Sequence, residues 1–365
     1  MKWLALLLAA AALAAQEIKT IDVPGSPGQS YALFVPARYI AERRWPILYC
    51  LDPGARGQAA VEHFAAAAER AGFLVAGSNN SRNGPLAPSE NAIRLMVQDT
   101  HARLSIDNER VYAAGLSGGA RLALAWAAVQ NSGIAGVVAN AAGFGSPSPP
   151  RHLPFRIFLT AGVDDPNYGE MYLLSRELAR RNVPHRFTEF QGGHEWMTHS
   201  VADEALDYFL GTVPPHPADA SRETERQVAE YVRLVPMLES GDRVLLHKLQ
   251  EDSKAAEDSP ARRLARRTIG GVAMGSMERM RELMSAKKYA EAAEAGEISV
   301  AIRPENASAW YSLAVARAAS GNTRRALEAL EQAAAHGFQA WQRAEAEPLL
   351  SKVRKDARYQ KIAAR

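Results

Sequence analysis

The sequence predicts an α/β fold, in which a mostly parallel sheet is covered by helices on both faces, followed by an all-α region. Two observations lead to this prediction. Between residues 30 and 210, short apolar segments alternate with alanine- and leucine-rich segments, as in buried parallel strands joined by crossover helices. After a cluster of prolines within residues 211–217, strand-like segments disappear and charged, alanine-rich sequence continues.

The expected elements follow one another in regular alternation. β-branched and aromatic residues predict the strands, and alanine-rich stretches predict the helices. The expected strands are residues 31–35, 45–51, 73–76, 111–114, 134–139, 155–159 and 185–190, and the expected helices between them include 59–71, 90–104 and 171–181. Since catalytic groups in such folds collect beyond the carboxyl ends of the strands, the loops at those ends are where a site is expected.

Charge and cysteine content exclude several classes of protein. A net charge of +3 over 365 residues gives no basic footprint for nucleic acid. The basic run over residues 262–267 is interpreted as the solvated face of a helix.

The single cysteine, Cys50, lies in an apolar run, so it is expected to be buried, without an intrachain disulfide or a cysteine zinc cluster. No metal and no organic cofactor is expected.

The N-terminus resembles an export signal. Lys2 precedes an apolar stretch over residues 3–15, which is shorter than the roughly 20 residues that span a bilayer. Ala12-Leu13-Ala14 offers the small-x-small pattern that signal peptidase reads. We therefore expect residues 1–15 to be removed and the mature protein to be exported, periplasmic or secreted, without stable membrane insertion. An uncleaved anchor is the alternative.

A serine stands at the junction between a predicted strand and a predicted helix. Residues 115–119 read Gly-Leu-Ser-Gly-Gly and fit G-x-S-x-G, in which a strained turn holds a nucleophilic serine above a sheet. The structural alternative is a tight turn whose serine caps the helix. Because a serine hydroxyl needs a base, and the base needs an orienting group, the rest of the chain must supply both for Ser117 to act.

The partners occur in the chain order Ser, Asp, His. Asp164 and Asp165 follow the strand expected at 155–159, and His194 comes one helix and one strand later, after two glycines. His194 is predicted to be the base and either Asp164 or Asp165 the acid, with one of the two aspartates stabilising a turn. His185 and His199 compete less well, since His185 begins a strand at the opposite end and His199 lies in the next helix.

These motifs resemble the α/β hydrolases of the feruloyl esterase and polyhydroxybutyrate depolymerase-like branch. The resemblance lies in residues 106–119, where Asp-x-x-Arg-Val-Tyr precedes G-x-S-x-G, in Asp165 three positions after Gly162, and in the segment Gly-Gly-His-Glu-Trp over 192–196. It covers about residues 30–210. It implies the α/β-hydrolase fold, the triad Ser117, Asp165 and His194, and hydrolysis of carboxylic esters.

One loop departs from that branch. Its relatives usually carry His-Gly after the second strand, where a backbone N–H helps to form the oxyanion hole, whereas residues 51–55 here read Leu-Asp-Pro-Gly-Ala. Proline has no N–H, so Gly54 or Ala55 is expected to donate together with Gly118. The residues expected to line the substrate pocket are Asp52, Asn80, Arg82 and Trp196. The alternative for the 79–83 loop is a hydrogen-bonded surface loop.

Four regions are expected in the chain. They are the signal peptide at 1–15, the α/β-hydrolase catalytic domain at 16–213, a proline-rich boundary and helical linker at 214–270, and a helical domain at 271–365. Residues 306–338 resemble a tetratricopeptide repeat, with Trp310, Leu313, Ala314, Gly321, Ala326, Leu330 and Ala333 at the spacing of that helix-turn-helix unit. The helical region is expected to be separable from catalysis.

The sequence thus predicts an exported serine hydrolase that cleaves small-molecule or polymer-linked carboxylic esters through an acyl-enzyme. A serine peptidase with the same fold is one alternative. A non-catalytic protein that binds a protein partner through its helical repeats is another, and Asp52 beside the expected oxyanion hole favours it.

Overall fold

The computed structural model describes residues 17–145 and 149–363. The expected signal peptide lies outside the described residues. The chain divides into two compact units. We call the first, which runs up to Gly162 and resumes over Glu170–Ala220, the sheet unit. The second, the helical unit, comprises Val163–Gly169 and the chain from Ser221 onward. This division differs from the expected one, because a short segment after a strand belongs with the helices.

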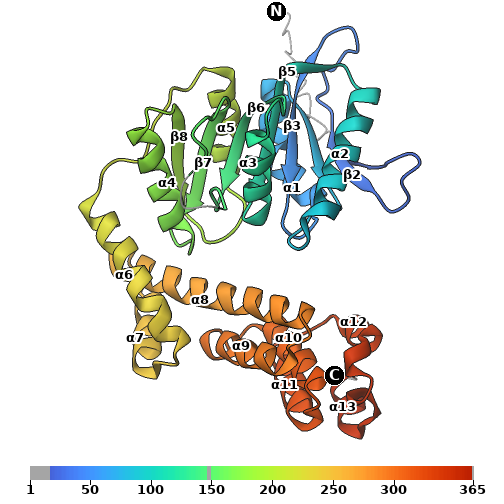
Figure 1. Cartoon of the computed structure of the whole chain (residues 1–365), viewed down its shortest axis with the longest axis vertical. Helices are drawn as coiled ribbons and strands as arrows, with labels where there is room; N and C mark the ends of the chain where they lie inside the picture. The colour runs from blue at the N-terminus through green and yellow to red at the C-terminus, as the bar shows by residue number, and fades with distance from the viewer. Residues whose placement is uncertain (1–16, 146–148, 364–365) are drawn as a thin grey trace, which may run out of the picture. The chain divides into compact units, whose positions relative to one another are not determined.

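The sheet unit contains eight strands in the order β1-β2-β4-β3-β5-β6-β7-β8 (Figure 1). β1 pairs with β2, and β2 with β4, in antiparallel fashion, while all other neighbours are parallel. The strands are β1 (Lys19–Asp22), β2 (Ser30–Phe34), β3 (Trp45–Leu51), β4 (Leu74–Ser78), β5 (Ile106–Leu116), β6 (Ile134–Asn140), β7 (Arg156–Gly162) and β8 (His185–Phe190). The mostly parallel sheet is confirmed, and β1 is an edge strand that the sequence did not predict.

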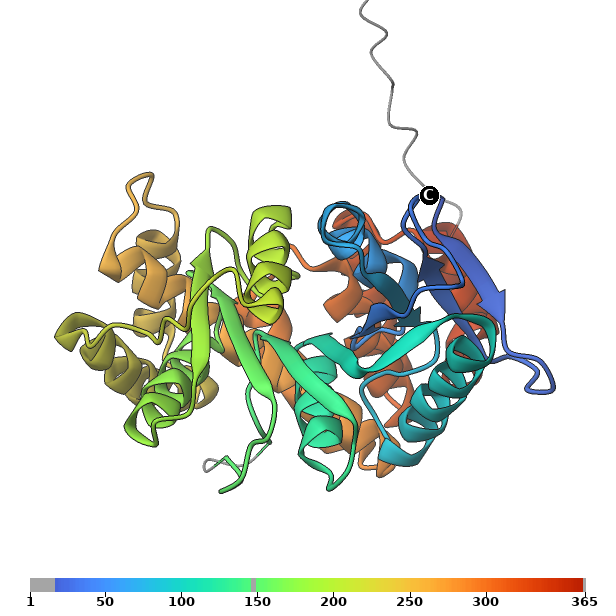
Figure 2. The ribbon, with the colours of Figure 1, turned by 90° about the horizontal axis from the view of Figure 1, so that it is seen from above.

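Helices cover both faces of this sheet. They are α1 (Gly57–Ala71), α2 (Leu86–Arg103), α3 (Gly118–Ala128), α4 (Tyr168–Arg180) and α5 (His199–Leu210). Figure 2 shows α1 and α5 on one face, and α2, α3 and α4 on the other. Every residue of β3 is buried, including Cys50, as expected for a parallel strand covered on both sides.

The parallel register brings several strand ends together. Leu116 at the end of β5 pairs with Asn140 at the end of β6, and Asn140 pairs with Thr160 of β7. Gly162, the last residue of β7, pairs with Phe190, the last residue of β8. The loops that leave these strands therefore emerge at one edge of the sheet, where the sequence placed the candidate site.

The helical unit is built from α6 (Arg222–Glu239), α7 (Arg243–Ser253), α8 (Pro260–Ser285), α9 (Tyr289–Ile302), α10 (Ala307–Ala319), α11 (Thr323–Ala335), α12 (Trp341–Ala346), the 3₁₀ turns η1 (Pro348–Leu350) and η2 (Val353–Lys355), and α13 (Ala357–Ala363). Apolar residues of α6, α7, α8 and the end of α9 form one core, which includes Leu234, Leu249 and Ile269. The expected linker at 214–270 is therefore mostly a packed part of this unit. α10 and α11 span the expected repeat and share a second core, while the tetratricopeptide assignment stays a prediction.

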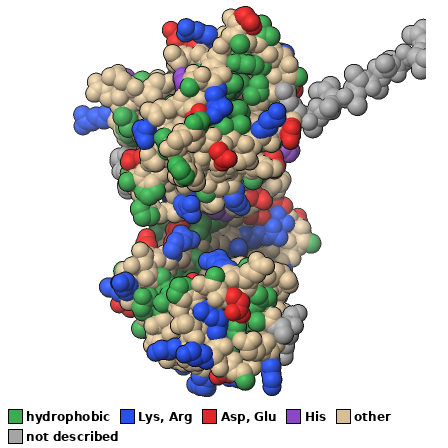
Figure 3. Space-filling view, turned by 90° about the vertical axis from the view of Figure 1, so that its right-hand side faces the viewer, with side chains coloured by type: hydrophobic (Ala, Val, Ile, Leu, Met, Phe, Trp, Pro, Cys, Tyr) green, Lys and Arg blue, Asp and Glu red, His purple; other side chains and the backbone are tan. Residues whose placement is uncertain are grey.

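The described surface carries mixed charge. On the face in Figure 3, Lys and Arg side chains are scattered over the helical unit, with acidic side chains among them, rather than gathered in one stripe. Among the described residues, no helix is long and apolar enough to cross a membrane, and no cluster of His, Cys, Asp and Glu has the arrangement of a metal site.

Candidate active site

Ser117 occupies a strained turn between β5 and α3. Its φ of 53° and ψ of −122° lie in a region that non-glycine residues rarely adopt. A Cβ on Gly115 would lie 2.2 Å from the carbonyl of Gly119, and a Cβ on Gly119 would lie 2.0 Å from the carbonyl oxygen of Leu51. Both positions therefore require glycine, so the G-x-S-x-G spacing has a steric cause here, as in a nucleophile elbow.

Asn140, at the end of β6, connects this turn with the loop that carries His194. Its backbone carbonyl accepts a hydrogen bond from the N–H of Ser117 at 2.8 Å. Its side-chain Nδ2 donates to the carbonyl of Glu195 at 3.2 Å, and its Oδ1 accepts from the N–H of Met197 at 2.7 Å. Asn140 is completely buried, so one residue fixes both segments. The sequence analysis missed Asn140, because one asparagine at a strand end belongs to no motif.

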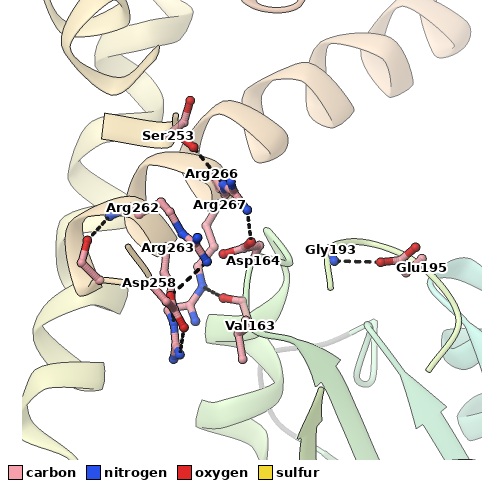
Figure 4. A network of polar contacts seen from close by, with 11 residues as sticks. Val163, Asp164, Gly193, Glu195, Ser253, Asp258, Arg262, Arg263, Arg266 and Arg267 are labelled. Carbon is pink, nitrogen blue, oxygen red and sulfur yellow. Dashed lines mark hydrogen bonds and ion pairs between the residues drawn. The ribbon is translucent and has the colours of Figure 1, made fainter. Parts of the chain in front are cut away.

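His194 lies partly buried in the loop between β8 and α5. A Cβ on Gly162 would lie 2.4 Å and 2.5 Å from the carbonyl oxygens of Gly192 and Gly193, so this loop packs directly on the end of β7. Within the loop, the N–H of Gly193 donates to the Glu195 carboxylate at 3.1 Å (Figure 4). The loop thus has a defined conformation on either side of His194.

The competing histidines have other surroundings. His185 begins β8 and is buried, with Nε2 2.7 Å from the hydroxyl of Ser175 and Nδ1 2.8 Å from the carbonyl oxygen of Val183. Burial lowers the pKa of His185. His199 begins α5, is exposed, and contacts the carbonyl of His63 through Nδ1 at 3.2 Å. Each ring has structural contacts away from the Ser117 turn.

The two adjacent aspartates differ in their contacts. Asp165 is completely buried, and its Oδ1 accepts the N–H of Asn167 at 2.7 Å, which closes a local turn. Asp164 forms an ion pair with Arg266 of α8, with 2.8 Å between Oδ2 and Nη1. The two carboxylates are therefore held differently, as expected for successive residues of an extended segment.

Asp52 holds the loop after β3 in place. Its Oδ1 accepts from the N–H of Gly54 at 2.8 Å and from Arg56 at 2.8 Å, and its Oδ2 accepts from Trp196 Nε1 at 2.9 Å. Burial alone would raise the pKa of Asp52, but the hydrogen bonds from Arg56, Trp196 and Gly54 outweigh burial and lower it. Asp52 is consequently ionised and internally paired.

This arrangement corrects part of the predicted oxyanion hole. The N–H of Gly54 donates to the Asp52 side chain, and the N–H of Ala55 donates to the Asp52 carbonyl at 3.1 Å. Both of these expected donors are already engaged, Gly54 by the ionised carboxylate and Ala55 by a backbone carbonyl. Gly118, at the start of α3, lines a cavity, and its N–H remains the predicted oxyanion donor.

The cavity beside Gly118 has a volume of about 300 Å³, within the range of small-molecule sites. Its lining combines apolar and polar side chains, among them Arg82, Asn83, Leu86, Arg121 and Leu122. Arg121 binds the Glu170 carboxylate through two hydrogen bonds of 2.8 Å. Arg82 is exposed, which leaves its guanidinium accessible to a ligand.

Of the four residues expected to line the pocket, Arg82 lines this cavity. The other three have structural contacts instead. Asp52 and Trp196 bind each other in the interior. The Asn80 side chain donates to the carbonyl of Gly28 at 2.8 Å and accepts the N–H of Ser30 at 2.8 Å, which fastens the approach to β2. These contacts fit the hydrogen-bonded alternative for Asn80.

Strand order and the strained serine turn together identify the architecture of this unit. The sheet unit has the α/β-hydrolase fold.

No family model and no curated protein matches the sequence. Among solved structures, the chain is similar to a ferulic acid esterase, with 18% identity over 51% of this chain and 93% of the other and a TM-score of 0.43. It is also similar to the feruloyl esterase module from Clostridium thermocellum, with 14% identity, 56% and 92% coverage and a TM-score of 0.46.

A third similar structure is S-formylglutathione hydrolase from Staphylococcus aureus, with 14% identity over 54% of this chain and 97% of the other and a TM-score of 0.42. In all three comparisons about half of this chain is covered. Activity therefore has to be argued from the residues of the site.

Proposed function

We propose that this protein is an exported serine hydrolase that cleaves carboxylic esters through a covalent acyl-enzyme. The observation that carries the proposal is the strained conformation of Ser117, with its N–H bound to Asn140. Strain of this kind persists only where the surroundings enforce it, and it is typical of functional sites. The Asn140 side chain also holds the loop of the proposed base.

In the proposed reaction, Ser117 Oγ attacks the acyl carbon while His194 takes the hydroxyl proton. Negative charge develops on the carbonyl oxygen, where the N–H of Gly118 would donate a hydrogen bond. The C–O bond to the alcohol then breaks, and His194 returns its proton to the departing oxygen. A water molecule, deprotonated by His194, hydrolyses the acyl-enzyme and releases the acid.

Asp165 is assigned as the group that orients His194 and stabilises the imidazolium. Two observations support Asp165 over Asp164. Asp165 follows β7 at the position that the sequence motif indicates, and the carboxylate of Asp164 is paired with Arg266. Complete burial of Asp165 fits the role of an orienting acid.

The test compares esters with amides and wild type with Ser117→Ala. We expect hydrolysis of short p-nitrophenyl and hydroxycinnamoyl esters by wild type, and a loss of at least about four orders of magnitude in kcat in Ser117→Ala. Matched anilides distinguish the second candidate, a serine peptidase with the same triad. Hydrolysis of neither class by folded wild type would contradict an enzymatic function and favour an interaction protein.

Export is the second part of the proposal, and it rests on the sequence of residues 1–16. We expect mature protein to begin near Ala15 or Gln16 after cleavage by signal peptidase. N-terminal sequencing of the protein recovered outside the cytoplasm tests this. Recovery of protein that retains Met1 would contradict cleavage.

A further inference from the structure

The segment Val163–Gly169, which carries Asp165, belongs to the helical unit rather than to the sheet unit. It begins directly after Gly162, the last residue of β7. Residues of α6 and α8, which lie more than fifty positions later in the chain, contact it. Helices that the α/β-hydrolase fold itself does not supply therefore contribute to the conformation of this segment.

Arg267 of α8 makes the most enclosed of these contacts (Figure 4). Its Nε donates to the carbonyl of Val163 at 2.7 Å, and its Nη1 donates to Gln227 of α6 at 3.1 Å. The guanidinium lies 3.7 Å from the centre of the Tyr168 ring. Arg267 is 5% exposed, and an arginine is buried this deeply only where several partners offset the cost of removing it from water.

Further contacts from α6 and α8 hold the interior of the segment Val163–Gly169. Arg266 pairs with Asp164 and also donates to the carbonyl of Ser253 at 2.9 Å. A Cβ added to Gly270 would lie 3.6 Å from Pro166, and one added to Gly169 would lie 3.2 Å from Val228. Side chains of α6 and α8 thus contact the segment before and after Asp165.

We propose that α6 and α8 position the catalytic acid, with Arg267 as the principal positioning residue for the Asp165 carboxylate. This inference rests on the proposed function, in which Asp165 is the acid. Arg267 holds the peptide two residues before Asp165 and the ring three residues after it. Because a displacement of about 1 Å at a catalytic group can cost about a hundredfold in rate, a change at Arg267 is expected to lower kcat.

The proposal reverses two sequence-based expectations. The run at 262–267 was interpreted as a solvated helix face, yet Arg267 is buried and Arg266 is paired with Asp164. The helical region was expected to be separable from catalysis, whereas the segment bearing Asp165 is packed by that region. The Arg262 side chain is only 13% exposed and pairs with Asp258, so it does not form a solvated face either.

The experiment uses the full chain and one p-nitrophenyl ester. The variants are Arg267→Lys, which keeps the charge but loses the planar fork of donors, and Arg266→Gln, which removes a partly exposed ion pair. Arg262→Gln is the matched control, because it lies on the same helix and pairs only with Asp258 in the described contacts. Asp165→Asn serves as the reference for loss of the acid.

We expect Arg267→Lys to lower kcat by about ten- to a hundredfold with KM within about twofold. We also expect the acid limb of its kcat/KM profile to move in the same direction as in Asp165→Asn, because both changes disturb the contact between the proposed acid and the proposed base. Arg266→Gln should change both quantities in the same direction by less, and Arg262→Gln should change neither. A merely structural defect would lower the folded fraction without moving the pH profile.

Labelling of Ser117 by a fluorophosphonate is measured first, and a folded wild type that is not labelled overturns the proposed function and this inference together. A labelled enzyme whose kcat and pH profile are unchanged by Arg267→Lys overturns the positioning role alone. If Arg267→Lys does not fold, kcat and the pH profile of kcat/KM are measured in Arg266→Gln instead. Wild-type values of both in Arg266→Gln would overturn the inference.

Discussion

The N–H of Ser117 donates to the backbone carbonyl of Asn140 at 2.8 Å, while the side chain of the same asparagine binds the loop on both sides of Trp196, at Glu195 and Met197. Asn140 therefore relates the proposed nucleophile to the loop of the proposed base through one buried residue. The strained turn at Ser117 and the loop of His194 cannot shift independently while these three hydrogen bonds are intact.

Asn140→Asp should lower kcat by about ten- to a hundredfold. The aspartate keeps an acceptor for the N–H of Met197 but replaces the Nδ2 donor with an oxygen that faces the carbonyl of Glu195. The control is Asn91→Asp on the exposed face of α2, which should leave kcat unchanged. Steady-state kinetics on folded variants check this, and a wild-type kcat in Asn140→Asp would show that the loop does not depend on the side chain.

Asp165→Asn should lower kcat by about 10⁴, the loss seen when the orienting aspartate of a serine protease triad is replaced. Asp164→Asn should have a much smaller effect, since it removes one ion pair to Arg266. The two variants differ by one position and share the same ester assay. A nearly normal kcat in Asp165→Asn beside an inactive Asp164→Asn would transfer the role of the acid to Asp164.

Asp52 should make the free energy of unfolding depend on pH in the acid range. Its pKa in the folded protein lies below the usual value of 3.8, so the unfolded chain binds more protons, and stability rises with pH through this window. The contribution is fully present above about pH 4 and is lost as pH falls through the lower, folded pKa. Asp52→Asn should reduce the free energy of unfolding near pH 7 by about 1–3 kcal/mol, because hydrogen bonds to the charged carboxylate are weakened.

Urea unfolding of wild type, Asp52→Asn and the exposed control Asp22→Asn, measured between about pH 3 and 7, tests this dependence. The difference between wild type and Asp52→Asn should shrink at the acid end. A constant difference across the series would mean that Asp52 does not ionise within the fold as described.

Arg82 should favour esters that carry a carboxylate. The exposed guanidinium lines the cavity beside Gly118, and an exposed ion pair contributes up to about 1 kcal/mol. Arg82→Ala should therefore raise KM by about two- to fivefold for a p-nitrophenyl hemisuccinate and leave KM for p-nitrophenyl butyrate unchanged. Arg94→Ala, on the outer face of α2, is the control. Equal effects on both esters would exclude a charge contact.

Much of the sheet unit was predictable because its signals are local. The apolar run from Trp45 to Leu51 and the segment from His185 to Phe190 coincide with β3 and β8, since fully buried strands leave a continuous hydrophobic pattern. The turn at Ser117 was predictable for a related reason. Its glycines are required by contacts with residues only a few positions away and with the neighbouring strand.

The parts that were missed depend on contacts distant in sequence. Neither Asn140 nor Arg267 has a local pattern that distinguishes it from an ordinary turn or surface residue. The engagement of Gly54 follows from how the Asp52 side chain is oriented by Arg56 and Trp196, which no spacing rule predicts. The grouping of residues 163–169 with the helices likewise requires tertiary packing between segments far apart in the chain.

The central claim is that Ser117 is an activated nucleophile, and fluorophosphonate labelling followed by peptide mass spectrometry tests it most directly. We predict a single adduct on Ser117 in the wild-type chain, and a labelling rate at least about a hundredfold lower in His194→Ala, because the base activates the hydroxyl. Ser117→Ala should remain unlabelled. Folded wild type without an adduct on Ser117, or His194→Ala labelled at the wild-type rate, would contradict the claim.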